Sequence, residues 1–292
     1  MKYQLSALRS QGSIPIPLDL LTMPFSISGC LILFCIIITC IPYHISHAKT
    51  PKNRLDTAGS YTWISVGDWQ RMALNYSRQW HKNWNAGLGG YYFRRILNQQ
   101  AQSDLSLVAP VYYTHKNLTL KTQVDLAPQA SILPLYALEL APSYRLDSIP
   151  FTLFTRYRYV NYDIAYAHVS QSAITYHANR FDLAAHMYLI LPQFGSNLLT
   201  PQIRLNYRFN YFWRLAWWST YGYETLNERF VDPNRQAIQW SNFIQVRHLL
   251  TDWQGINLGV SYVHFLAENE QMASEIFNQN RLEASLHYFV RF

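Results

Sequence analysis

Charged residues are scarce in this 292-residue chain. Asp, Glu, Lys and Arg together make up 14%, whereas soluble globular proteins average about 25%. Aromatic residues reach 16%, yet the mean hydropathy is only -0.12. A helical membrane protein would have a strongly positive value, because each span needs about 20 apolar residues in a row. The composition disfavours a helical membrane protein and a highly charged soluble enzyme. It leaves a β-rich soluble fold and a membrane β-barrel open.

Long apolar runs are absent, with one exception near the N-terminus. The run Ile27–Ile41 is short for a membrane span, follows the basic residues Lys2 and Arg9, and precedes a small-x-small pattern that ends at Ala48. This order is typical of an export signal, so we expect residues 1–48 to be removed by cleavage after Ala48. A retained membrane anchor is the alternative interpretation of the same run.

Cysteine is missing from the exported part, residues 49–292. The three cysteines are Cys30, Cys35 and Cys40, all inside the leader, whichever of Met1 and Met23 is the start. This excludes a disulfide framework, a cysteine-based zinc site and a thiol nucleophile in the exported chain. We predict no cofactor and no metal site.

A sustained helical period is also missing beyond residue 50, where apolar and polar residues alternate instead. Between Ile203 and Tyr211, for example, every second residue is apolar and the residues between them are Arg or Asn. Many such segments run to ten or more residues, longer than the strands of a typical sandwich. Aromatic residues also crowd the segment ends, as at Tyr211–Trp213. These features favour an all-β, antiparallel, up-and-down transmembrane β-barrel in the outer membrane of a Gram-negative bacterium.

The breaks between segments predict the topology of one barrel domain. Tight turns are expected at 81–83, 115–117, 147–150, 178–179 and 251–252, and longer links near 98–103, 128–133, 192–200, 226–236 and 268–277. Short and long links alternate, as they do between the periplasmic and outer ends of such barrels. Counting from about Tyr61 gives about 14 strands. The alternative is 12, because the stretches 59–66 and 166–178 alternate poorly.

The last segment ends on an aromatic residue. Arg281–Phe292 alternates throughout, and its apolar positions include Tyr288, Val290 and Phe292. Outer-membrane barrels commonly end in such a strand, which the barrel-assembly machinery recognises. We therefore predict that Tyr288, Val290 and Phe292 form the assembly signal.

Short motifs in a particular order resemble the YaiO-type outer-membrane β-barrel family over roughly residues 58–292. They are Gly59-Ser60-Tyr61, Gly67-Asp68-Trp69, Arg71, Tyr76, Trp84-Asn85-Ala86, Ala127-Pro128 to Leu133-Pro134, and Arg156-Tyr157-Arg158-Tyr159. The resemblance implies an outer-membrane barrel and no defined activity. The helical repeats that precede the barrel in some relatives have no room between Ala48 and Gly59.

No catalytic motif is present in the sequence. A barrel-wall hydrolase would need a serine, a histidine and an acid or amide together. Ser285 and His287 share one face of the last segment but lack a motif around them. Asp163 and His168 are the nearest acid–histidine pair for an omptin-like protease, and their spacing is not specific. We predict that the protein is not an enzyme.

Basic residues recur on the polar face of the predicted strands, which in a barrel lines the lumen. The predicted lumen-lining set is Arg71, Lys121, Arg145, Arg156, Arg158, Arg204, Arg208, Arg247, Arg281 and Arg291. The acidic residues expected near them are Asp125, Glu139, Asp182, Glu224 and Glu283. These charges can form ion pairs that fill the barrel, or a basic channel that concentrates anions.

The dispersed basic residues and the absence of a recognition helix argue against nucleic-acid binding. The expected partners are outer-membrane lipid, lipopolysaccharide and the barrel-assembly machinery, with anionic solutes or polysaccharide as cargo. The oligomeric state is left open. Three functions are compatible with the sequence: a pore or export-associated channel, a structural or interaction barrel with a filled lumen, and a lipid- or peptide-modifying enzyme without a recognisable motif.

Overall fold

The computed structural model describes residues 51–64, 67–97, 100–163, 165–194, 197–223, 238–266 and 280–292. The chain divides into two units, residues 1–49 and 50–292, and every described residue belongs to the second. The predicted export signal and its three cysteines lie outside the described residues.

The described residues form fourteen strands. They are β1 (Asn53–Ile64), β2 (Gly67–His81), β3 (Trp84–Leu97), β4 (Gln100–His115), β5 (Leu118–Leu126), β6 (Tyr136–Arg145), β7 (Phe151–Asn161), β8 (Tyr166–His177), β9 (Phe181–Pro192), β10 (Leu198–Arg208), β11 (Trp213–Tyr223), β12 (Ile238–Leu249), β13 (Gln254–Leu266) and β14 (Arg281–Arg291).

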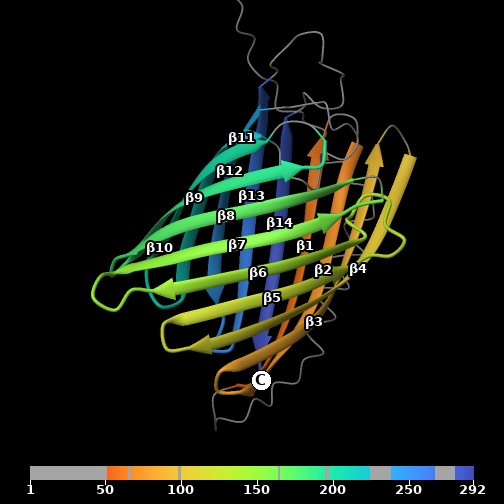
Figure 1. The fold of residues 1–292 in the computed structure, drawn as a ribbon. Coiled ribbons are helices and arrows are strands. Elements are labelled where there is room, and N and C mark those ends of the chain that lie inside the picture. The colour runs from red at the N-terminus through yellow and green to blue at the C-terminus, as the bar shows by residue number, and fades with distance from the viewer. Residues whose placement is uncertain are drawn as a thin grey trace, which may run out of the picture. The chain divides into compact units, whose positions relative to one another are not determined.

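The strands close into one antiparallel barrel (Figure 1). Each strand pairs with its neighbours in sequence, and β1 pairs with β14 from Arg54↔Arg291 to Trp63↔Leu282. Closure leaves no sheet edge, so the backbone groups of every strand find partners within the barrel. The predicted fold class is confirmed, with 14 strands and not 12. The stretches 59–66 and 166–178, which alternate poorly in sequence, belong largely to β1 and β8.

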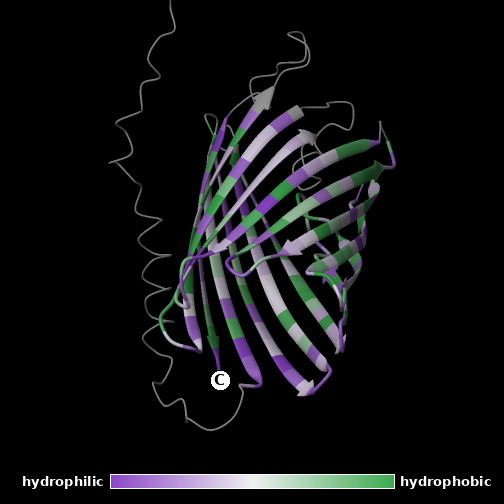
Figure 2. Cartoon of the chain, turned by 90° about the vertical axis from the view of Figure 1, so that its left-hand side faces the viewer, coloured by the Kyte–Doolittle hydropathy of each residue, from purple (hydrophilic) through white to green (hydrophobic). Residues whose placement is uncertain are grey.

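Burial along the strands is reversed relative to a soluble barrel. In β6 the side chains of Leu138 and Leu140 are exposed, whereas the intervening Glu139 is buried. β10 repeats this pattern, with Ile203 exposed and Gln202 buried. Apolar and polar bands alternate along the strands of Figure 2. An apolar outer face and a polar interior are what a barrel surrounded by lipid requires.

No helix within the described ranges is long and apolar enough to cross a membrane.

The connections differ between the two ends of the barrel. One end, which we call the turn end, holds the links 82–83, 116–117, 146–150, 178–180, 209–212 and 250–253, together with Phe292. At the opposite end, which we call the loop end, the described link residues are 127–135, 162–163, 165, 193–194, 197 and 280. The predicted tight turns all lie at the turn end. Of the predicted longer links, 128–133 and the described parts of 98–103 and 192–200 lie at the loop end, whereas 226–236 and 268–277 lie outside the described residues.

Two predicted links are shorter than expected. Pairing of Leu97 with Gln100 leaves only 98–99 between β3 and β4, so the polar residues up to Ser103 are strand residues. Between β9 and β10 the link spans 193–197 instead of 192–200. In both places a strand extends beyond the residues whose sequence alternates between apolar and polar. The first strand likewise begins at Asn53, before the predicted start near Tyr61.

Candidate channel interior

The strand register places all ten predicted basic residues at positions that alternate with the lipid-facing side chains. They therefore lie on the interior face of the wall. Three further arginines share this face: Arg54, Arg95 and Arg214. The acidic residues on it are Asp56, Asp104, Asp125, Glu139, Asp182 and Glu283, whereas Glu224 lies outside the described residues. Within the described ranges, the interior face carries thirteen basic and six acidic residues, and 13 − 6 leaves an excess of seven positive charges.

Two ion pairs join β5 to β6 and to β7 on the interior face of the wall. The Lys121 ammonium lies 2.7 Å from a carboxylate oxygen of Glu139, and the Arg158 guanidinium lies 2.7 Å from one of Asp125. The second carboxylate oxygen of Glu139 is 4.0 Å from Arg156. Both carboxylates are buried. Separating either pair would leave a buried charge uncompensated, so both pairs stay formed. Their side chains therefore occupy part of the interior.

A hydrogen-bond network lines the wall from β8 to β11. Gln202 donates to the hydroxyl of Thr220 (2.8 Å) and accepts from Arg204 Nε (2.8 Å). The Tyr188 hydroxyl donates to Gln202 (3.1 Å) and accepts from Gln171 (2.9 Å). Gln171, Gln202 and Thr220 are buried, so their amides and hydroxyl have exchanged water for protein partners. This side of the interior is ordered by its own side chains.

The link between β5 and β6 folds into the barrel at the loop end. Ile132 packs with Trp69 of β2 and Phe93 of β3, and all three side chains are buried. The Asp104 carboxylate accepts backbone N–H bonds from Ser131 (2.9 Å), Ile132 (2.6 Å) and Leu133 (2.7 Å). It also accepts the Ser131 hydroxyl at 3.1 Å. Segment 127–135 is thus tied to the wall and narrows the interior at this end.

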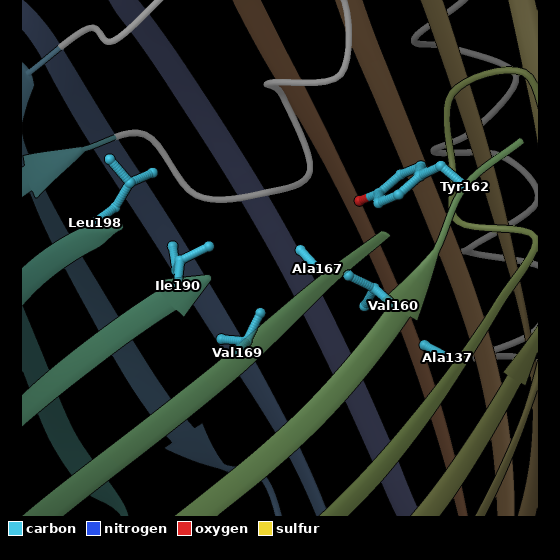
Figure 3. Packing of buried hydrophobic residues seen from close by; sticks show 7 residues of the cluster. All are labelled: Ala137, Val160, Tyr162, Ala167, Val169, Ile190 and Leu198. Atoms are coloured by element: carbon cyan, nitrogen blue, oxygen red, sulfur yellow. The ribbon is translucent and has the colours of Figure 1, made fainter. Parts of the chain in front are cut away.

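An apolar patch covers the interior face beside that narrowing. It consists of Ala137, Val160, Tyr162, Ala167, Val169, Ile190 and Leu198. Figure 3 shows the seven side chains along the neighbouring strands β6 to β10 and the β7–β8 link. The register joins them directly, since Leu198 is opposite Ile190 and Ile190 is opposite Val169. Part of the interior face at the loop end is therefore apolar.

A cavity of about 800 Å³ occupies the interior beside β1 to β5. Arg54, Asp56, Arg71, Lys121 and Glu283 are among its lining residues. Charged side chains of both signs therefore surround an open space that could hold a small solute.

The sequence candidates for catalysis are not assembled into a triad. Ser285 and His287 do share the interior face, but both imidazole nitrogens of His287 have other partners. Asn257 is 2.7 Å from Nδ1, and Asp56 is 2.9 Å from Nε2. A serine base needs one ring nitrogen directed at the hydroxyl. His168 lies on the outer face of β8, where its Nδ1 is 2.5 Å from the Tyr157 hydroxyl.

A metal site is likewise not evident in the part of the chain that the structure describes. No group of three or more His, Cys, Asp or Glu side chains there is arranged to hold an ion.

Sequence reasoning missed Arg54, Arg95, Arg214, Asp56 and Asp104 for different reasons. Arg54 and Asp56 precede the predicted first strand, and the alternation of the Arg95 and Arg214 segments is irregular. Asp104 directly follows the stretch taken for a loop. Its polar position opposite Phe93 becomes evident only when β3 and β4 are extended to Leu97 and Gln100.

Comparison with known proteins shows the fold but no family. No protein-family model and no curated protein matches the sequence. Among solved structures, the CymD monoaromatic hydrocarbon channel has a TM-score of 0.61 at 9% identity, covering 84% of this chain and 89% of that one. The Pseudomonas putida toluene transporter TodX has a TM-score of 0.57 at 13% identity, with 87% and 93% covered. A Pseudomonas aeruginosa FadL homologue has 0.55 at 8% identity, with 82% and 90% covered.

The chain has the fold of outer-membrane channel barrels. At these identities the similarity establishes the architecture, and the transported compounds belong to the named proteins.

Proposed function

We propose that the protein is an outer-membrane channel for small anionic solutes. The observation that supports this most is the excess of seven positive charges on the described interior face. Dispersed basic residues in a low-dielectric channel attract anions and repel cations, as rings of Arg or Lys do in anion-selective pores. The cavity of about 800 Å³ places Arg54, Arg71 and Lys121 in contact with the space that a solute would use.

A filled structural barrel is the second candidate function. It is favoured by the inward fold of segment 127–135 and by the buried ion pairs Lys121–Glu139 and Arg158–Asp125. These groups reduce the open cross-section, although the cavity beside β1 to β5 remains.

Planar-bilayer recording separates the two candidates. Purified, folded protein between unequal KCl solutions should carry current. Its reversal potential should lie closer to the equilibrium potential of chloride than to that of potassium. Folded protein that conducts no ions would reject the channel and leave the structural barrel. A current that favours potassium would reject anion selectivity.

Several finer assignments belong to the same proposal. Membership of the YaiO-type family is supported by the ordered motifs between Gly59 and Tyr159, and the comparisons support only the broader class. Residues 1–48 are proposed as the export signal, so N-terminal sequencing of membrane-extracted protein should begin at Lys49. A start before that residue would indicate a retained leader.

Assembly by the barrel-assembly machinery is proposed to use Tyr288, Val290 and Phe292. In the structure, β14 closes onto β1 through reciprocal backbone bonds of 2.8 and 2.9 Å between Asn53 and Phe292. A Phe292→Ser variant should accumulate less in the outer membrane but refold normally in detergent. Equal accumulation of the wild type and the Phe292→Ser variant in the outer membrane would reject the assembly role. Lipid, lipopolysaccharide and polysaccharide are proposed as the other contacts of the barrel.

A further inference from the structure

Several arginines lie on the interior face near the turn end, and four of them form two directly opposed pairs. Arg54 is opposite Arg291 in the register of β1 and β14, and Arg214 is opposite Arg247 in β11 and β12. Arg208 of β10 is also opposite Arg214, but it lies 3.7 Å from the Asp182 carboxylate. Like charges at directly opposed positions repel and destabilise a pair of strands. Two such pairs at one end of the barrel are stable only if a negative charge or solvent offsets the repulsion.

Phe289 lies among three of these arginines. The guanidinium carbons of Arg54, Arg247 and Arg291 are 4.9, 4.7 and 5.6 Å from the centre of its ring. The ring lies against bare backbone, because a Cβ on Gly255 would come 2.7 Å from its atoms. Cation–π attraction holds the guanidiniums near one another but does not neutralise them. The ring therefore brings arginines from β1, β12 and β14 to the same place.

The nearby carboxylates already have partners. Asp56 accepts two bonds from Arg54, at 2.6 and 2.7 Å, and lies 2.9 Å from His287. Asp252, in the β12–β13 turn, accepts the Tyr211 hydroxyl at 2.9 Å, and this bond raises the pKa of Tyr211.

The other three arginines of the cluster have no such partner. Within the described ranges, no carboxylate oxygen lies within 4.0 Å of a side-chain nitrogen of Arg214, Arg247 or Arg291. Nε of Arg247 is in addition buried without a hydrogen-bond partner. A buried donor without an acceptor is costly, and a bound oxyanion would supply acceptors to all three guanidiniums.

We propose that Arg54, Arg214, Arg247 and Arg291 form a binding site for a phosphate-type oxyanion, either free or as part of a small solute. Guanidinium groups bind oxyanions of this kind through paired N–H donors at fixed geometry. The interior cavity reaches Arg54 and Asp56, so a solute inside the barrel can approach the site. The inference rests on the proposed channel function and names the charged group that the channel recognises.

Calorimetric titration of the folded full-length barrel in detergent with inorganic phosphate tests the site directly. Sodium chloride keeps the ionic strength constant, so general screening does not contribute to the measured heat. Wild-type protein should bind phosphate, and Arg247→Gln should bind at least about tenfold more weakly, a factor equivalent to about 1.4 kcal/mol. Arg78→Gln is the matched control, because Arg78 lies near the same end but on the outer face against Trp80. Its affinity should equal that of the wild type.

A structural measurement accompanies the titration. Without phosphate, Arg247→Gln should unfold at a higher urea concentration than the wild type, because the substitution removes one like-charge pair. Phosphate should then stabilise the wild type but not the variant. If Arg247→Gln does not fold, as judged by gel mobility, Arg291→Gln takes its place.

Three outcomes would overturn the site: no phosphate binding by the wild type, equal binding by all forms, or equal loss in Arg247→Gln and Arg78→Gln. The channel proposal is tested separately, by conductance. Phosphate binding by a barrel that conducts no ions would leave the site in place and reject the channel. Conductance without phosphate binding would reject the site and leave the channel proposal in place.

Discussion

The backbone N–H of Ile132 donates a 2.6 Å hydrogen bond to the carboxylate of Asp104, and this contact ties a connecting segment to the inside of the barrel wall. Asp104 lies in β4, and Ile132 lies in the link after β5. Ser131 and Leu133 share the same carboxylate. Together with the packing of Ile132 against Trp69 and Phe93, this carboxylate holds segment 127–135 inside the barrel at the loop end.

The first prediction concerns this attachment. Asp104→Asn should free segment 127–135, because an amide is a weaker acceptor and its NH₂ group opposes the backbone donors. Each lost bond to a charged acceptor is worth roughly 1.5–3 kcal/mol, so the segment should leave the wall often. Single-channel recordings should show a larger and noisier current. Ser131→Ala, which removes only the hydroxyl bond, should change the current little. An unchanged current in Asp104→Asn would show that the segment does not limit conductance.

The second prediction concerns interior charge. Glu139→Gln removes the partner of Lys121 and adds one positive charge to the interior, so the preference for chloride over potassium should increase. The free energy of unfolding should fall by roughly 1–3 kcal/mol, because Lys121 loses a charged acceptor. Reversal potentials and urea titrations measure the two effects. Asp147→Asn is the control, since it makes the same charge change in the β6–β7 turn. Equal reversal potentials for both variants would argue against selectivity set at Glu139.

The third prediction concerns the ring of Phe289. Gly255→Ala places a Cβ 2.7 Å from two of its ring atoms, so the ring has to move and the arginines stacked on it lose their support. Overpacking of this kind costs roughly 1–3 kcal/mol, which a urea titration followed by gel mobility can detect. Gly90→Ala is the control, because the nearest atom to its added Cβ is 3.9 Å away. Similar stability of both variants would contradict the close approach.

The fourth prediction concerns the lipid-facing surface. Leu107 is 54% exposed at the middle of β4, whereas Leu118 is 39% exposed at the first residue of β5. A lysine at the bilayer midplane costs about 2–4 kcal/mol, and one near the interface about 0–1 kcal/mol. Leu107→Lys should therefore unfold in lipid vesicles at a much lower urea concentration than Leu118→Lys. In detergent, which adapts to the charge, the two should differ less. Equal losses in vesicles would contradict the assigned membrane depth.

Much of the architecture followed from the sequence by itself. Alternation with period two determines the face of each side chain, because neighbouring residues of a strand point to opposite sides. That rule was enough to predict a 14-stranded barrel and its turn positions at 81–83 and 115–117. It was not enough at 98–103, where polar strand residues resemble a loop.

The tertiary structure decided which interior residues meet. The opposition of Arg54 and Arg291 depends on the register of the first and last strands, and no local pattern encodes a register between segments so distant in sequence. The same holds for Asp104 and Ile132, because an inward fold of a link leaves no periodic trace. Alternation predicted which side chains share a face, whereas closure and strand register determined that Arg54, Arg247 and Arg291 gather around Phe289.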